Sequence, residues 1–142
     1  MYIKLPQLNS LLRNPGYTFK FETSATNLIF NVINSTKIKS IAIPSFLCEE
    51  ILVSVNLCDI NINYYELDDN LSPLLKEQHK KSDCLFICDY FGYPIKITED
   101  IKLFFSEKNK ITIFDRSHSL LAGIEDIDHS FLNIKNKIFL IY

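Results

Sequence analysis

The sequence predicts an α/β fold built on a mostly parallel sheet, and three features indicate it. Short apolar, β-branched runs alternate along the chain with segments of helical periodicity. The run at residues 83–88 is apolar almost throughout, as expected of a central parallel strand buried on both faces. The 142 residues suffice for one domain with a substantial core. We therefore expect a single domain over residues 1–142.

Composition excludes several function classes. The net charge of −2 gives no electrostatic basis for binding nucleic acid or an anionic membrane. No apolar run approaches the roughly 20 residues of a membrane helix, and the N-terminus lacks a signal-peptide block, so we expect a cytoplasmic protein. The four cysteines form no C-x-x-C pair, so we expect no zinc site, and Cys84 and Cys88 are expected in the core. The three glycines exclude a glycine-rich phosphate loop.

The first expected elements are a helix at residues 25–35 and a strand at 39–43. Apolar residues of the first segment recur at helical spacing, and Thr23 or Ser24 is a good helix cap. The second segment is β-branched and is expected to stop at Pro44.

A second helix is expected to be capped by Ser45. Glu49 and Glu50 fall in its first turn, where the helix dipole favours negative charge. Its buried stripe is predicted to consist of Ile51, Leu52 and Val55. Apolar and polar residues alternate at 60–64, which predicts a strand with one face more exposed to solvent.

The rest of the chain continues the alternation. Ser72-Pro73 is expected to open a helix through about residue 80, because proline suits the first helical position. After the strand at 83–88, Thr98 is expected to cap a helix through about residue 108. The run at 111–114 is the next strand, residues 123–128 read as a loop, and residues 130–142 as one or two strands.

The candidate site lies where these strands end. The run at 111–114 stops at Asp115, and His118 follows three residues later. A parallel sheet gathers the segments after its strands at one edge, so 23–26, 44–48, 89–94 and 115–118 are expected to meet there. The helix start at 23–26 offers backbone N–H groups and hydroxyls for a phosphate, although it is equally an ordinary cap.

Taken alone, these residues leave other interpretations open. Asp115 is compatible with a carboxylate that caps its loop, and His118 with a hydrogen-bonded structural histidine. A small hydrolase using His118 with Ser117 or Ser119 is a further alternative. It lacks the G-x-S-x-G elbow of such enzymes.

Five segments between about residues 21 and 122 together resemble the N-terminal part of the DegT/DnrJ/StrS-type aminotransferases. In chain order they are FETSATNLIF, IAIPSFLCEEI, NINYYELDDNLSP, CDYFGYP and IFDRSHSLLAG. The fourth resembles the family's H-x-[FY]-G-x-P loop. These are fold type I pyridoxal-phosphate enzymes that aminate keto-sugars for polysaccharide and antibiotic biosynthesis.

The resemblance implies pyridoxal phosphate as cofactor and a role for each matched residue. Asp115 would pair with the protonated pyridine nitrogen, and His118 would hydrogen-bond the ring hydroxyl. The phosphate would be held by Ser24, Ala25 and Thr26. Cys48 falls where many members place an aromatic ring over the cofactor.

The Schiff-base lysine that the family needs would be Lys135 or Lys137. The family's Gly-Gly after the lysine, the rest of its large domain and its small domain have no counterpart here. The resemblance thus implies an incomplete cofactor domain of an enzyme that transfers an amino group, typically from glutamate, to a keto-sugar nucleotide, and a homodimer if complete. A non-catalytic α/β binding module that retains the fold, for a sugar nucleotide or a protein partner, is the alternative.

Overall fold

The computed structural model describes residues 24–119 and 137–141. Its helices are α2 (Ala25–Thr36), α3 (Glu49–Asn56), α4 (Glu77–Lys80) and α5 (Glu99–Ser106), with the 3₁₀-helix η1 (Ser117–Ser119). Its strands are β1 (Ser40–Pro44), β2 (Asn61–Leu67), β3 (Pro73–Leu74), β4 (Cys84–Cys88), β5 (Ile111–Asp115) and β6 (Lys137–Ile141).

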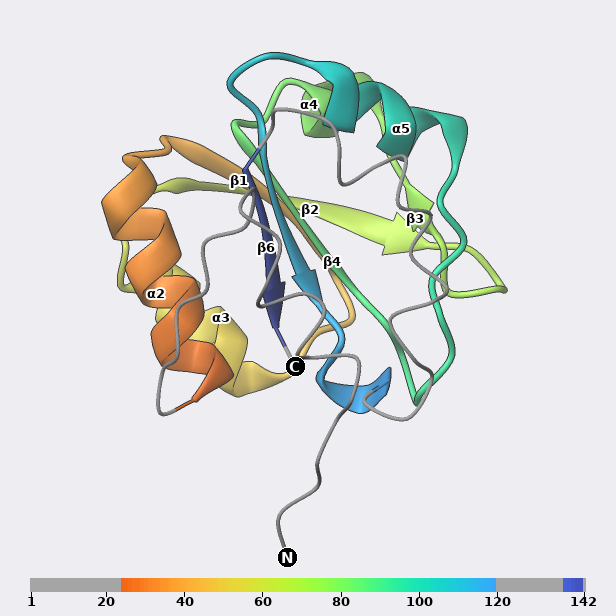
Figure 1. Cartoon of the computed structure of the whole chain (residues 1–142), viewed down its shortest axis with the longest axis horizontal. Helices are drawn as coiled ribbons and strands as arrows, with labels where there is room; N and C mark the ends of the chain where they lie inside the picture. The colour runs from red at the N-terminus through yellow and green to blue at the C-terminus, as the bar shows by residue number, and fades with distance from the viewer. Residues whose placement is uncertain (1–23, 120–136, 142) are drawn as a thin grey trace, which may run out of the picture.

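The strands form one sheet in the order β3-β2-β1-β4-β5-β6. All neighbours pair in parallel except β3, which is antiparallel to β2 at one edge. The strand order reverses between β1 and β4, because β2 lies on one side of β1 and the later strands lie on the other (Figure 1). The predicted α/β class with a mostly parallel sheet is confirmed. Ligands of open α/β sheets bind beyond the carboxyl ends of the strands at such a reversal.

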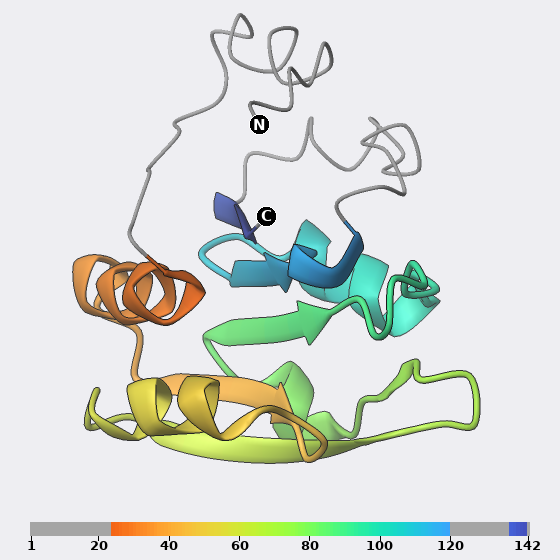
Figure 2. The ribbon, with the colours of Figure 1, turned by 90° about the horizontal axis from the view of Figure 1, so that it is seen from below.

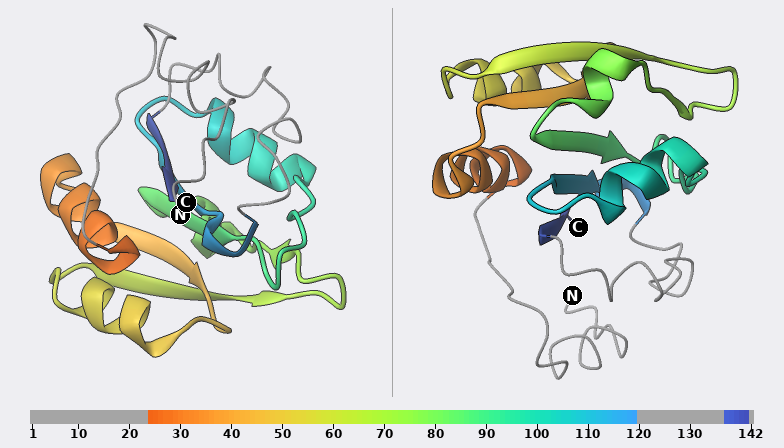
Figure 3. Two further views of the ribbon diagram at one scale, coloured as in Figure 1. Left: turned by 60° about the horizontal axis from the view of Figure 1, so that its bottom comes forward. Right: turned by 90° about the horizontal axis from the view of Figure 1, so that it is seen from above.

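Helices cover both faces of the sheet (Figures 2 and 3). On one face α2 and α3 bury Ile29, Val32 and Val55 against residues such as Ile43, Phe86 and Ile113. On the other face Ile101 and Phe104 of α5 pack against residues such as Leu85, Ile87 and Phe114. Successive strand residues therefore belong to opposite layers, as the pleat requires.

Helix α2 agrees closely with the prediction. Ser24 caps it, and its Oγ accepts a hydrogen bond of 3.1 Å from the backbone N–H of Asn27. The helix ends at Lys37, whose φ of 56° places it in the left-handed region. The strand that follows runs one residue further than predicted and includes Pro44.

The prediction that Ser45 caps the second helix is wrong. The Ser45 hydroxyl donates instead to Glu66 Oε2 at 2.8 Å, and α3 begins only after Cys48, which makes no side-chain cap. The predicted stripe holds for Ile51 and Val55, which are buried. Ser54 takes the third buried position, whereas Leu52 is half-buried.

The expected helix from Ser72 is also wrong in its first part. Asp68 Oδ1 accepts hydrogen bonds of 2.8 Å from the backbone N–H groups of Asn70 and Ser72, which makes a tight turn after β2. The turn sends the chain back along β2, so Pro73 enters the short antiparallel strand β3. Only the single turn α4 is helical. Strict alternation of strand and helix is therefore broken here.

Other boundaries shift modestly. The strand predicted at 60–64 extends to Leu67, the one at 111–114 includes Asp115, and α5 ends at Ser106 rather than near residue 108. One strand of the predicted C-terminal region is β6, parallel to β5. The predicted loop at 123–128 and Lys135 lie outside the described residues. No helix within residues 24–119 is both long and apolar enough to cross a membrane.

Candidate functional site

The amino ends of α2 and α3 lie at the same edge of the sheet as the carboxyl ends of β4 and β5 (Figure 1). This edge lies at the reversal of strand order between β1 and β4. Of the predicted residues, Asp115 ends β5, His118 follows in η1, and Cys48 lies directly before α3. The edge therefore brings most of the predicted site into one region.

Asp115 occupies the last position of β5, directly opposite Cys88 at the end of β4. Ile113, two residues before Asp115, packs in the layer under α2 and α3, as does Cys88. The period of two places Asp115 on that same face. The Asp115 side chain is buried, and its Oδ1 accepts a hydrogen bond of 2.9 Å from the backbone N–H of Ser117.

The thiol of Cys88, opposite Asp115, has a shifted pKa. Burial raises the pKa of its thiol to about 12, and the negative charge of Asp115 acts in the same direction. The thiol is therefore neutral at physiological pH. Cys84 is fully buried and Cys88 half-buried, so the prediction that both belong to the core is confirmed for Cys84 and in part for Cys88.

Tyr90 joins the ends of β1 and β4. Its hydroxyl donates a hydrogen bond of 2.5 Å to the carbonyl oxygen of Phe46, and its ring centroid lies 5.6 Å from that of Phe46. Burial raises the pKa of Tyr90, and the neighbouring Cys88, Asp115 and Cys48 reinforce the shift. Cys48 is exposed and lies at the first turn of α3. The rings of Phe46 and Phe91, both largely exposed, stand 6.5 Å apart at this edge.

A tight turn at residues 90–93 packs against η1. Phe91 and Gly92 both have positive φ, 54° and 83°, and the backbone N–H of Tyr93 donates to the carbonyl of Tyr90 at 2.9 Å. Two consecutive positive φ angles define a type I′ turn, for which glycine is favoured. A Cβ on Gly92 would lie 3.2 Å from the carbonyl oxygen of His118. The turn therefore needs glycine both for its backbone and for its approach to His118.

A buried ion pair lies behind this edge. Arg116 Nε donates to Asp89 Oδ2 at 2.8 Å, and both side chains are almost completely buried. Asp89 follows Ile87 and Arg116 follows Phe114 by two residues, so both belong to the face covered by α5. Neither residue was among the predicted site residues. The sequence signal that could have found them is the two-residue spacing from Ile87 to Asp89 and from Phe114 to Arg116. It continues the alternation of faces past the end of each strand.

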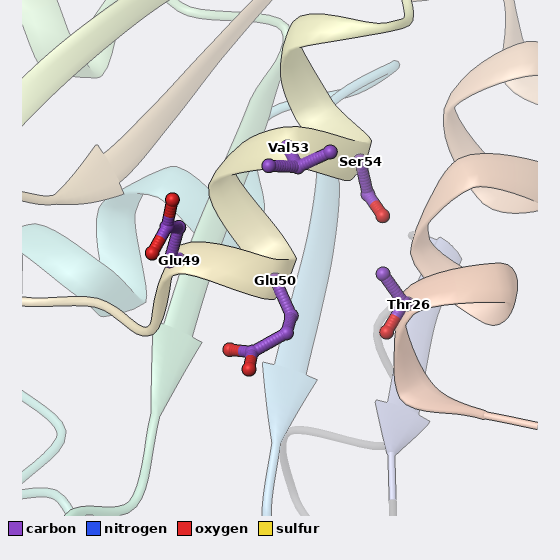
Figure 4. Close-up of a pocket in the computed structure, with 5 residues that line it drawn as sticks. All are labelled: Thr26, Glu49, Glu50, Val53 and Ser54. Carbon is purple, nitrogen blue, oxygen red and sulfur yellow. The ribbon is translucent and has the colours of Figure 1, made fainter.

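The amino end of α2 borders a hollow of about 380 Å³ between α2 and α3 (Figure 4). Thr26 and Ser54 face each other across it, and Glu50 is among the other residues that line it. The first-turn N–H groups of a helix have no intrahelical partner and attract anions. Glu49 and Glu50 add negative charge beside this hollow, which opposes an anion.

The donor set fits the chemical groups of pyridoxal phosphate. A buried carboxylate at the carboxyl end of a central strand matches a protonated ring nitrogen, because burial strengthens the attraction between opposite charges. The capped amino end of α2 matches a phosphate. His118 and Ser117 are exposed at η1.

The register places Lys137 away from these residues. Its backbone pairs with Ile111 at the amino end of β5, whereas Ile141 pairs with Asp115. The four intervening steps span about 13 Å at the usual rise of a strand, which is more than a lysine side chain covers. The strand register therefore does not support a role for Lys137 beside Asp115.

The geometry of η1 gives no support to a serine hydrolase. Successive residues of a 3₁₀-helix project in directions about 120° apart, so Ser117 and His118 diverge. Within residues 24–119 no hydrogen bond joins the side chains of these two residues. The side chain of Ser119 lies outside the described part of the structure.

Comparisons with known proteins show the fold. No protein-family model matches the chain, and no curated protein matches its sequence. The histidinol-phosphate aminotransferase from Clostridium acetobutylicum superposes with a TM-score of 0.53 and 19% sequence identity, over 66% of this chain and 30% of that one. The match thus spans less than a third of that protein. The chain has a mixed α/β fold with a mostly parallel sheet, which it shares with part of that structure.

Proposed function

We propose that this chain binds pyridoxal phosphate and forms part of the cofactor domain of an aminotransferase. The observation that carries the proposal is the position of Asp115, buried at the carboxyl end of β5 on the sheet face that α2 covers. The aminotransferase-like fold supports it independently. A buried carboxylate and a helix amino end at the same edge of a sheet are suited to a ligand with a cationic ring nitrogen and an anionic phosphate.

Each residue would have a distinct role in binding. Asp115 would accept a hydrogen bond from the ring nitrogen and keep it protonated, while the N–H of Ser117 holds its Oδ1. Ser24, Ala25 and Thr26 would hold the phosphate through hydroxyl and backbone N–H groups. The cofactor, when bound, supplies an electron-poor ring that accepts the electron pair of a substrate carbanion.

The remaining positions rest on the resemblance described above. His118 would hydrogen-bond the ring hydroxyl, and Cys48 would lie over the ring in place of an aromatic side chain. The Schiff-base lysine would be Lys135 or Lys137; the backbone of Lys137 lies at the opposite edge of the sheet, and Lys135 lies outside the described residues. The proposed reaction is transfer of an amino group to a keto-sugar nucleotide, in a homodimer and in the cytoplasm.

Titration with pyridoxal phosphate tests the proposal. We expect saturable binding, seen in the cofactor absorbance, and Asp115→Asn is expected to weaken it about 10- to 100-fold, as for loss of a charge-assisted hydrogen bond. Asp59→Asn is the matched control, because Asp59 is exposed and lies in the turn after α3. Absence of binding by the wild type at millimolar cofactor, or equal affinity of Asp115→Asn, would overturn the proposal.

The lysine is identified separately. Borohydride reduction fixes the cofactor to the lysine with which it reacts, and mass spectrometry of the digested protein locates it. We expect the label on Lys135 or Lys137 and its loss when the labelled lysine is replaced by alanine, with the alanine variant of the other lysine as the matched control. A label on any other lysine would contradict this assignment.

A non-catalytic binding module is the second candidate, and the backbone position of Lys137 favours it. It predicts reversible binding of pyridoxal phosphate or a sugar nucleotide with no covalent label after borohydride. The two candidates therefore give different results in the same experiment.

A further inference from the structure

The buried pair of Asp89 and Arg116 is connected to Asp115 through the backbone. The N–H of Asp89 donates to the carbonyl oxygen of Asp115 at 2.9 Å. Arg116 directly follows Asp115, and the next residue, Ser117, donates its N–H to Asp115 Oδ1 at 2.9 Å. The second carboxylate oxygen of Asp89, Oδ1, accepts from the N–H of Ile95 at 2.9 Å. One carboxylate therefore holds the residue after Asp115 and the segment that leads to α5.

Stability alone gives a weak reason for this pair. Removing two charges from water costs free energy that their mutual attraction only partly returns, so apolar replacements of buried pairs are often neutral or stabilising. Arg116 is also incompletely satisfied, since its Nη1 is buried with no hydrogen-bond partner in the described part of the chain. An unmatched buried donor is a further cost. The hydrogen bond from the Nε–H of Arg116 to Asp89 does, however, hold the guanidinium group in one orientation.

The two members of the pair lie on the opposite sheet face from Asp115. Arg116 is on the face covered by α5, together with Phe114, whose ring centroid lies 5.7 Å from the guanidinium carbon. Anchoring Arg116 on that face fixes the backbone that turns from β5 into η1. The direction of the Ser117 N–H is fixed with it, and this N–H sets the orientation of the Asp115 carboxylate.

We propose that Asp89 and Arg116 are positioning residues that hold the Asp115 carboxylate in one orientation from behind the sheet. The consequence for cofactor affinity rests on the function proposed above, whereas the effect on Asp115 itself does not.

Amide hydrogen exchange of Ser117, followed by NMR, tests the positioning without any cofactor. Arg116→Lys keeps the positive charge but loses the fixed Nε–H direction. We expect it to lower the protection of the Ser117 amide at least tenfold, while the amide of Ile113 within β5 keeps its protection. Unchanged protection at Ser117 in the folded variant would overturn the proposal.

A second variant keeps the test valid if Arg116→Lys does not fold. Asp89→Asn combined with Arg116→Met removes both charges and retains an oxygen acceptor for the N–H of Ile95. We expect a folded protein with the same loss of protection at Ser117. Thr112→Val is the matched control, because Thr112 is buried at the other end of β5, two residues before Phe114 on the same face. It is expected to leave Ser117 unchanged, and protection lost equally in this control would contradict the proposal.

Cofactor titration separates this inference from the proposed function. We expect Arg116→Lys to weaken pyridoxal phosphate binding at least tenfold and Thr112→Val to leave it within twofold. Loss of protection at Ser117 with unchanged affinity would refute the cofactor consequence. A wild type that does not bind would refute the proposed function, and the Ser117 exchange would still decide whether Asp89 and Arg116 position Asp115.

Discussion

The hydroxyl of Tyr90 donates a 2.5 Å hydrogen bond to the carbonyl oxygen of Phe46, and this bond connects β4 to β1 at the reversal of strand order. The two residues are 44 positions apart in the sequence. The loop after β1 is otherwise attached to its neighbours by the hydrogen bonds of Ser45 to Tyr65 and Glu66. The bond therefore helps to hold the loop that carries Cys48 against the segment that follows β4.

Tyr90→Phe should destabilise the protein by about 1 kcal/mol, because it leaves the carbonyl of Phe46 without its donor. Urea unfolding measures this as a lower midpoint with an unchanged slope. Tyr93→Phe is the control, since the side chain of Tyr93 is largely exposed and should lose almost nothing. Equal midpoints for the two variants would show that the hydrogen bond contributes no stability.

Gly92→Ala should cost about 1–2 kcal/mol of unfolding free energy, because its φ of 83° is unfavourable for a residue with a Cβ. Asn109→Ala imposes a similar backbone cost, at a φ of 73° in the turn after α5. Only Gly92→Ala also brings a Cβ to 3.2 Å from the His118 carbonyl. We therefore expect altered NMR shifts of the His118 amide in Gly92→Ala and none in Asn109→Ala. Shifts in both variants would contradict the specific contact.

Stability should fall above pH 9 partly because of Cys88. Below the thiol's ordinary pKa of 9.0 both the folded and the unfolded states keep the proton. Between pH 9 and about 12 the unfolded state loses it first, because burial raises the folded pKa to about 12. Unfolding is thus favoured as pH rises, by up to about 1.4 kcal/mol per pH unit for this group.

The Cys88→Ala variant isolates this contribution. Its unfolding free energy, measured by urea at pH 8, 9 and 10, should decline less steeply than that of the wild type. Cys48→Ala, which removes an exposed thiol, is the matched control and should change the slope less than Cys88→Ala does. A slope in Cys88→Ala as steep as in the wild type would rule out the thiol as a source.

Glu50→Gln should tighten the binding of anions at the amino end of α2. The carboxylate borders the hollow lined by Thr26, so its removal relieves repulsion of a phosphate (Figure 4). Because Glu50 is exposed, we expect a gain of only about 0.3–1 kcal/mol at low salt, declining as salt screens the charge. Titration with pyridoxal phosphate at two ionic strengths measures it. Glu107→Gln, at the far end of α5, is the control and should have no effect.

Local sequence signals predicted most of the fold. The apolar run that became β4 and the Ser24 cap of α2 were recognisable because each depends on neighbouring residues. Pro73 was misplaced because proline suits a helix start as well as a sheet edge, and the turn made by Asp68 decided between them.

The site was predictable only on one face of the sheet. Asp115 could be recognised because a carboxylate ends an apolar run. Arg116 was missed, because the spacing from Phe114 indicates only the face on which it lies, an arginine after a strand usually lies in solvent, and its partner Asp89 is 27 positions away. Such pairings depend on the sheet register, which the sequence alone leaves open.

Asp115 and Arg116 are adjacent in sequence but face opposite sides of the sheet. The length of β5 therefore decides whether the carboxylate or the guanidinium faces α2, and which of them faces α5. Deleting one residue between Ile111 and Asp115 would turn the carboxylate toward α5 and the guanidinium toward α2. Deleting two residues would restore the faces but would move Asp115 about 7 Å back from the edge of the sheet, because each strand residue spans about 3.3 Å. The number of residues in β5 therefore fixes both the layer that each side chain faces and the distance of Asp115 from the edge.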